Sequence, residues 1–129
     1  MSDDPLAHLD DAARAGRAWV LPSNPDITAA PGSAIEAFER IAWGVAWERP
    51  GLSSRDKRLI TIAVLGIQGT DRTLGLHIRG ALDSGDVTPE ELDAFLFHFG
   101  IYAGFPRGSA FAATLARVLA EKAEADGTA

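Results

Sequence analysis

Cysteine is absent from all 129 residues of the chain. Disulfide bonds, thiolate nucleophiles and cysteine-ligated zinc sites are therefore excluded. The sequence also lacks a glycine-rich phosphate-binding loop, and its acidic residues form no cluster at metal-ligand spacing. Histidine is then the residue type that can carry a proton near neutral pH, so the question of function narrows to the histidines and their surroundings.

Basic residues are in the minority. Lys and Arg number 12 against 18 Asp and Glu, which gives a net charge of −6 and a pI near 4.9. Nucleic-acid binding needs a clustered basic surface, so we exclude nucleic acid as a partner. An anionic substrate would need local arginine or lysine to offset the overall negative potential.

Long hydrophobic runs are missing as well. The longest, residues 59–67, is far shorter than the ~20 residues that span a bilayer. The first five residues lack the basic and then apolar pattern of a secretory signal. We therefore expect a soluble, cytoplasmic protein that has no membrane partner.

The apolar content indicates one folded domain. Hydrophobic residues make up 47% of the chain, and a chain of this length can bury a core of its own. The helical periods run almost without polar interruption, which favours faces reserved for sister subunits. We therefore expect an oligomer.

Helix signals recur along the chain, and no strand-type alternation is present. Ser33, Ser53 and Thr88 each precede an acidic residue by three positions, as in a capping box. Gly69 and Gly85 each follow a helical segment and predict its end. The sequence predicts an all-α, single-domain bundle of about six helices. Its predicted parts are an N-terminal helix with a Pro-rich wrapping segment (1–32), a helical domain (33–120) and a polar tail (121–129). The helix over residues 59–67 is apolar on every side, so we expect it at the centre or in a subunit interface.

Two histidines lie on neighbouring predicted helices. His77 follows the apolar stripe of one helix, and His98 neighbours Phe95 and Tyr102 on the next. Each could be an ordinary core histidine bonded to a carbonyl group. If both imidazoles face one apolar chamber, desolvation lowers their pKa values and suits them to acid-base chemistry. A metal site is the weaker alternative, because no third ligand stands at helical spacing.

Several other side chains could line such a chamber. Trp43 and Trp47 stand four apart, so they share a helix face and could wall a pocket or simply fill the core. Tyr102 could present its hydroxyl group to a ligand. Arg55 and Arg58 lie in the first turns of their helix, where positive charge opposes the helix dipole, and could hold an acidic substrate.

The order of these motifs resembles the carboxymuconolactone decarboxylase family over roughly residues 38–119. The residues that carry the resemblance are Trp43-Gly44, Trp47, Arg49-Pro50-Gly51-Leu52, Arg55, Arg58-Leu59, Leu76-His77, Arg79, Ala81-Leu82, Gly85, Thr88-Pro89-Glu90-Glu91, His98, Tyr102-Ala103-Gly104 and Pro106.

The resemblance implies an alkylhydroperoxidase D-like helical protomer assembled as a homotrimer or homohexamer, with pockets near subunit boundaries. It implies a cofactor-free lyase that removes carbon dioxide from 4-carboxymuconolactone or a related carboxylated lactone in aromatic-acid catabolism. Catalysis would fall to His77 and His98. Trp43, Trp47, Arg58, Thr73 and Tyr102 would contact the substrate. The redox activity of the sister branch needs a Cys-x-x-Cys pair and is excluded.

One position departs from the family pattern. A glutamate commonly precedes the first histidine by four residues in the family, and this chain has Thr73 there. A threonine hydroxyl group is not an acid or base near neutral pH, so a relay through that carboxylate is lost. The alternatives are therefore a divergent enzyme for another keto-acid-type or natural-product substrate, or a non-catalytic ligand-binding oligomer.

Overall fold

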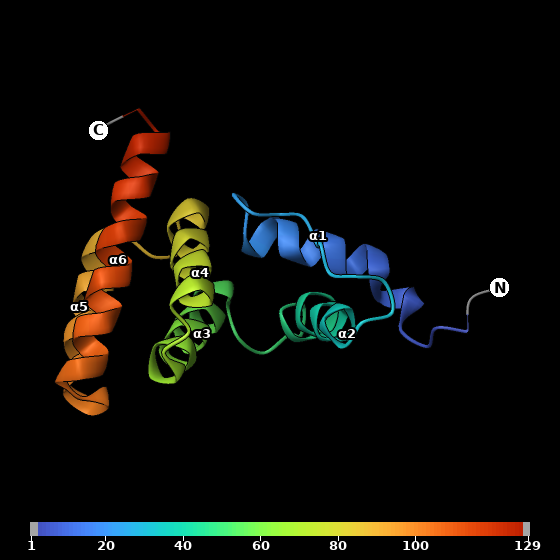
Figure 1. The fold of residues 1–129 in the computed structure, drawn as a ribbon, viewed down its shortest axis with the longest axis horizontal. Coiled ribbons are helices and arrows are strands. Elements are labelled where there is room, and N and C mark those ends of the chain that lie inside the picture. The colour runs from blue at the N-terminus through green and yellow to red at the C-terminus, as the bar shows by residue number, and fades with distance from the viewer. Residues whose placement is uncertain (1–2, 128–129) are drawn as a thin grey trace.

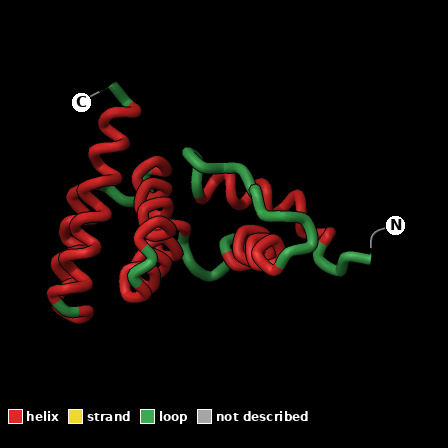
Figure 2. The backbone as a smooth tube through the Cα atoms, viewed as in Figure 1, coloured by secondary structure: helices red, strands yellow, loops and turns green. Residues whose placement is uncertain are grey.

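The computed structural model describes residues 3–127, and within that range the chain is helical with no strand (Figure 2). The prediction of an all-α bundle is confirmed. The elements in chain order are η1 (Ala7–Leu9), α1 (Asp10–Val20), α2 (Ala34–Ile41), η2 (Ala42–Ala46), α3 (Ser54–Gln68), α4 (Asp71–Ser84), α5 (Pro89–Ala103) and α6 (Phe105–Ala125).

The helices form two groups on either side of α4 (Figure 1). On one side α5 packs on α6, and α6 packs on α3 and α4. On the other side α1 packs on α2 and η2, and α1 also contacts α4. The helix that carries His77 therefore connects the two groups.

Each group has its own apolar core. The larger core lies among α3, α4, α5 and α6, and it contains Ile62, Leu74, Ile78, Leu92, Phe99 and Phe111. The smaller core lies under α1 and consists of Ala13, Val20, Leu21, Trp43 and Trp47, with Leu76 of α4 packed against it. Both predicted tryptophans thus belong to the smaller core, beside α4.

The helix boundaries follow the capping residues that the sequence shows. Ser33 and Ser53 accept hydrogen bonds from the backbone three residues on, and Thr88 forms a complete capping box with Glu91. Gly69 ends α3 and Gly85 ends α4, both at positive φ, a conformation that favours glycine. These predicted starts and stops are confirmed.

The last helix does not end where the predicted polar tail begins, at residue 121. It continues to Ala125, because Lys122 Nζ lies 3.0 Å from Asp83 Oδ1 on α4. The helix over residues 59–67 is not at the centre of the chain, since Ile60, Val64 and Ile67 are each about half exposed. The other predicted place for this helix, a subunit interface, stays a prediction. The central helix is α4.

Some expectations stay predictions. The division of the chain at residues 32 and 120 is one of them, and residues 128–129 of the predicted tail lie outside the described residues. The cytoplasmic location is another. None of the helices in the described range is long and apolar enough to cross a membrane.

Candidate functional site

His77 lies in a stack of aromatic rings. Its side chain is buried, with the residue 7% exposed. The imidazole is 5.8 Å from the ring of Trp43 and 5.9 Å from the ring of Trp47, measured between centroids, and both rings are nearly parallel to it. The two indoles are stacked at 6.4 Å. We call Trp43, Trp47 and His77 the Trp-His cluster.

The local backbone explains why the two indoles meet the imidazole. The chain between α2 and the 47–53 loop forms one turn of π-helix, with Trp47 N bonded to Ala42 O at 3.0 Å. Such turns widen a helix and recur at functional sites. The backbone of α1 comes very close to this turn, because a Cβ atom on Gly16 would lie only 2.1 Å from Trp43 O. Glycine at this position therefore lets α1 hold the π-turn, and with it the indoles, against α4.

Arg58 of α3 lies next to the Trp-His cluster and is 1% exposed. Its Nε donates to Asp86 Oδ2 at 2.8 Å, Nη1 to Val20 O at 2.8 Å and Nη2 to Trp19 O at 3.2 Å. The guanidinium Cζ is 5.9 Å from the centroid of Trp47, close enough for a cation–π contact. This differs from the open substrate ligand that the sequence predicts, since all three nitrogens already donate to protein oxygens.

Burial and positive charge keep His77 neutral. Desolvation, followed by the nearby charges of Arg58 and Arg17, lowers the pKa of His77 from 6.5 to about 4. A neutral imidazole has one N–H donor and one acceptor nitrogen, so at neutral pH His77 offers both. The same two guanidinium groups make the potential at the ring positive, which favours a bound anion there.

Trp43 carries an unsatisfied donor in this cluster. Its indole Nε1 is buried without a hydrogen-bond partner, and no other buried side-chain nitrogen or oxygen of residues 3–127 lacks one. A buried donor without an acceptor costs about 1–3 kcal/mol. A bound molecule that accepts a hydrogen bond from this Nε1–H would remove that cost.

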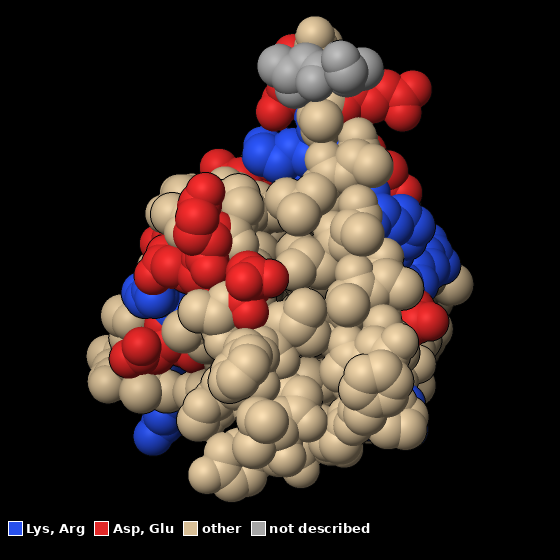
Figure 3. Space-filling model, turned by 90° about the vertical axis from the view of Figure 1, so that its left-hand side faces the viewer, with Lys and Arg blue, Asp and Glu red and all other residues tan. Residues whose placement is uncertain are grey.

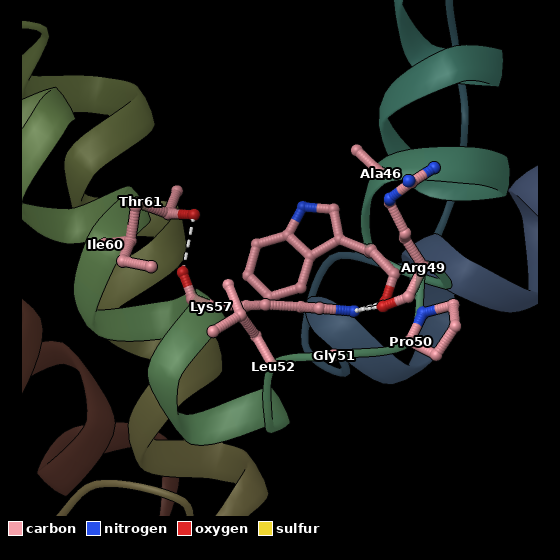
Figure 4. Close-up of a pocket in the computed structure, with 9 residues that line it drawn as sticks. Ala46, Arg49, Pro50, Gly51, Leu52, Lys57, Ile60 and Thr61 are labelled. Atoms are coloured by element: carbon pink, nitrogen blue, oxygen red, sulfur yellow. Dashed lines mark hydrogen bonds between the residues drawn. The ribbon is translucent and has the colours of Figure 1, made fainter.

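A cavity of about 430 Å³ opens beside Trp47 (Figure 4). On one side α3 contributes Lys57, Ile60 and Thr61, and on the other lie Ala46 and the 49–52 turn. Lys57 reaches across from α3, where its Nζ donates to Trp47 O at 2.7 Å and to Arg49 O. The walls are mostly apolar with cationic groups among them, which suits a small carboxylated molecule.

Sequence reasoning missed two of the residues that line this cavity, Lys57 and Thr61. Arg49 and the turn after it were noticed only as part of the family motif. The polar residues inside the otherwise apolar helix of residues 54–68 were the available signal. Nothing in the helical period indicated that Lys57 would turn toward the 47–49 backbone.

His98 does not face the interior of the chain as the sequence predicts. Its side chain is exposed, and it lines a separate cavity of about 310 Å³ with Tyr102, Phe95 and Ile67. Phe95 and Phe99 turn toward Phe111 of α6, so the adjacent His98 is rotated out of the core. The predicted chamber between His77 and His98 is therefore wrong.

Tyr102 and Thr73 also lie outside the Trp-His cluster. Tyr102 is 82% exposed, and its ring centroid is 5.1 Å from that of His98. Thr73 is exposed on α4, one helical turn before His77. Of the predicted site residues, the structure thus brings together Trp43, Trp47 and His77, with Arg58 behind them. Among residues 3–127 no three His, Asp or Glu side chains come together in a way that could hold a metal ion.

A family-profile comparison and pairwise comparisons with known proteins point to the same family. Residues 33–117 match the sequence profile of the Carboxymuconolactone decarboxylase family. Over 73 residues the chain is 42% identical to a 4-carboxymuconolactone decarboxylase of Acinetobacter baylyi, covering 57% of this chain and 54% of the relative. Over 71 residues it is 40% identical to nitrosuccinic acid decarboxylase npaB of Metarhizium robertsii, covering 55% and 49%.

The chain therefore spans about half the length of these relatives. No solved structure matches it significantly. The profile match covers more than half of this chain, including α2 to α5, the Trp-His cluster and the cavity beside it. The chain belongs to the carboxymuconolactone decarboxylase family.

Proposed function

We propose that this chain is a decarboxylase that acts on a small carboxylic acid whose carboxylate lies next to an electron-accepting group. 4-Carboxymuconolactone, or a related carboxylated lactone, is the first candidate. The observation that carries the proposal is a neutral, buried His77 in a positive, largely apolar surrounding, one ring away from an open cavity. The names of both relatives support the reaction class.

For this reaction the protein has to position the substrate and to stabilise the charge that develops on it. The bond between the substrate carbon and its carboxylate breaks, carbon dioxide leaves, and the bonding electron pair moves into the neighbouring carbonyl group as a dienolate. A proton taken from solvent water in the open cavity is then added at carbon. Hydrogen-bond donors directed at the developing oxyanion stabilise the transition state. Apolar walls favour the dispersed charge over the localised carboxylate.

The pKa of His77 indicates which role the imidazole takes. With a pKa of about 4 the free ring carries no extra proton at neutral pH, so it is a poor proton donor. Its N–H group can still donate a hydrogen bond to the oxyanion. We therefore assign His77 as the oxyanion partner, and the unsatisfied Nε1–H of Trp43 as a second donor. Neither residue lines the cavity, so this assignment requires the Trp47 ring to move aside when the substrate binds.

The cavity beside Trp47 is the proposed binding place for the substrate. Lys57 has two backbone acceptors already. Arg49 makes no ion pair in the described part of the chain, so its guanidinium group is available for a carboxylate. Arginine binds carboxylates in a two-pronged geometry, which would orient the substrate against the indole.

Incubation of the purified protein with 4-carboxymuconolactone tests the proposal. Carbon dioxide release and loss of substrate are followed together, and we expect saturable turnover with one carbon dioxide released per substrate consumed. Binding of the lactone without turnover would instead support the alternative of a non-catalytic ligand-binding oligomer.

Thr73 and the Metarhizium robertsii relative favour testing a second substrate class in the same assay. Nitrosuccinic acid carries a nitro group on the carbon that bears one of its carboxylates, and a nitro group accepts an electron pair as a carbonyl group does. If the chain is a divergent enzyme for such a substrate, it turns over nitrosuccinate and not the lactone. Thr73→Glu, which restores the family's carboxylate, then raises activity on the lactone.

We also propose that the chain associates with copies of itself, as a homotrimer or homohexamer. The face formed by α5 and α6 has a broad area without charged side chains across its centre and lower part (Figure 3). Phe97, Ile101, Tyr102 and Phe105 are all more than two-thirds exposed, and three residues of α3 add to the exposed apolar surface. Isolated soluble subunits rarely leave so many large apolar side chains in water.

Light scattering coupled to size-exclusion chromatography measures the assembly. We expect a mass of three or six chains for the wild-type protein and a smaller mass for Phe97→Glu. A wild-type protein that elutes as a monomer at all concentrations would contradict the proposal of self-association, and it would leave the proposed reaction untouched.

A further inference from the structure

A second polar cavity, of about 220 Å³, lies where residues 21–24 cross α4 and meet α6. Three arginines line it: Arg72 and Arg79 from α4, and Arg117 from α6. Arg72 and Arg79 are seven residues apart and therefore share a face of α4. In a chain with a net charge of −6, three guanidinium groups around one small cavity need an explanation.

Most of the donor groups in this cavity are unused. Arg72 forms no hydrogen bond or ion pair in the described part of the chain. Arg79 donates only through Nε, which lies 3.0 Å from both oxygens of Asp83. Arg117 donates through Nη1 to Glu121 at 3.1 Å. The remaining guanidinium N–H groups are available to an acceptor.

Gly75 leaves room for the guanidinium group of Arg117 next to the backbone of α4. A Cβ atom on Gly75 would come to 2.7 Å from Arg117 Nη2, so Arg117 occupies the space that a side chain on α4 would fill. Arg117 is thereby held across α4, where its free Nη2 lies at the backbone of Gly75.

The 21–24 segment supplies another donor. Asn24 accepts from Arg17 through both its backbone oxygen and its Oδ1, each at 3.0 Å. Its side-chain oxygen is thus occupied, and its amide Nδ2 has no partner among the described residues. Ser23 donates to Asp83, which fixes the segment against α4. The amide group of Asn24 and the arginines therefore line one cavity from two sides.

The balance of charge is positive. Glu121 is the one acidic residue among those that line the cavity, against three arginines. Asp83, just outside, is already bonded by Arg79, Lys122 and Ser23. The volume is below that of cavities that hold drug-sized ligands, so the cavity fits an ion or a short acid and excludes a nucleotide.

We propose that this cavity binds a small oxyanion, an inorganic phosphate or a short dicarboxylate, between Arg72, Arg79 and Arg117. Guanidinium groups recognise both kinds of oxyanion through paired N–H donors. The site shares no lining residue with the cavity beside Trp47. It is therefore separate from the proposed substrate site, and either proposal can fail without the other.

Isothermal titration of the full chain with inorganic phosphate, and separately with succinate, tests the proposal. Potassium chloride at equal ionic strength is the reference. The wild-type protein should bind at least one of the two oxyanions saturably at one site per chain, and the tighter of the two identifies the class of ligand. Arg72→Gln and Arg117→Gln should each weaken binding by about tenfold or more, since each removes charge-assisted hydrogen bonds.

Arg107→Gln is the matched control, because it removes one exposed arginine of α6 that does not line the cavity. It should bind the oxyanion as the wild-type protein does. Gly75→Ala gives an independent check, since the added methyl group displaces Arg117 and should weaken binding while far-UV circular dichroism stays unchanged. The proposal is overturned if neither oxyanion binds beyond the chloride reference, or if Arg72→Gln and Arg107→Gln bind equally well.

Discussion

The imidazole of His77 is parallel to the indole of Trp47, with 8° between the ring planes and 5.9 Å between the centroids. The same indole lines the 430 Å³ cavity. Trp47 therefore connects a buried, neutral histidine to a space that a small molecule can enter. The stability and the chemistry of this arrangement both depend on the charge of His77, which gives the first prediction.

Stability should fall in mildly acidic solution because of His77. Its pKa is lowered from 6.5 to about 4 in the folded chain, so below pH 6.5 the unfolded chain binds a proton that the folded chain does not. The free energy of unfolding should decrease by about 3 kcal/mol as the pH falls from 6.5 to about 4. Urea unfolding at several pH values measures this slope.

The variant His77→Gln should lose most of the slope in that pH range. Asp83 and Asp86 also have lowered pKa values, but their stabilising effect is present above the ordinary value of 3.8 and is lost only below it. The stabilising effect of Glu91 is lost in the same way below its ordinary value of 4.5, so the part of the slope above about pH 5 isolates His77. An equal slope in the wild-type protein and in His77→Gln would remove His77 as its cause.

Arg58→Met should be strongly destabilising. The change leaves Asp86 without its buried cation, and it leaves the carbonyl groups of Val20 and Trp19 without donors. We expect a loss of about 3–5 kcal/mol in the free energy of unfolding, the usual cost of breaking a buried ion pair. Arg55→Met, on the same helix, removes a half-exposed pair with Glu91 and should cost about 1 kcal/mol or less. Equal losses of unfolding free energy in the two variants would show that burial of an ion pair does not determine its contribution to stability.

The variant Trp43→Phe distinguishes a role of the Trp43 indole in substrate binding from a role in folding. The substitution keeps an aromatic ring on His77 and removes the unsatisfied Nε1 donor. The free energy of unfolding should change by less than about 1.5 kcal/mol, because the lost packing is offset by the removal of a buried donor without a partner. If substrate accepts from this donor, kcat/KM falls by about tenfold or more. A variant with lower stability and unchanged kcat/KM would show that the indole serves packing alone.

Gly16→Ala should disrupt the placement of the π-turn. The new methyl group would lie 2.1 Å from Trp43 O, so α1 must move away from η2. We expect a loss of more than about 2 kcal/mol, as for other overpacked sites. Gly100→Ala is the control, since its nearest neighbour would be 3.9 Å away, and it should stabilise α5 slightly through higher helix propensity. Thermal unfolding of both variants measures the contrast.

Local signals in the sequence were sufficient for the helices. Thr88 and Glu91 form the predicted capping box, and Gly69 and Gly85 end helices where predicted, because caps and left-handed glycines depend on neighbours within a few residues. The pairing of Trp43 with Trp47 was predictable for the same reason.

The partners of each helix face could not be predicted in this way. A helical period places His98 beside Phe95 and Tyr102, but it does not say which of these side chains meets α6. The position of Arg58 depends on Val20 and Trp19, nearly forty residues earlier in the chain. Long-range contacts of this kind decide whether a titratable side chain is buried or open, and no local pattern encodes them.

The most direct test compares kcat/KM for carbon dioxide release by His77→Gln and by His98→Gln on whichever substrate the wild-type protein accepts. We place the reaction beside His77, so His77→Gln should lose a factor of about 100 or more and His98→Gln less than about threefold. Full activity in His77→Gln together with loss of activity in His98→Gln would contradict it, and would move the reaction to the cavity on α5.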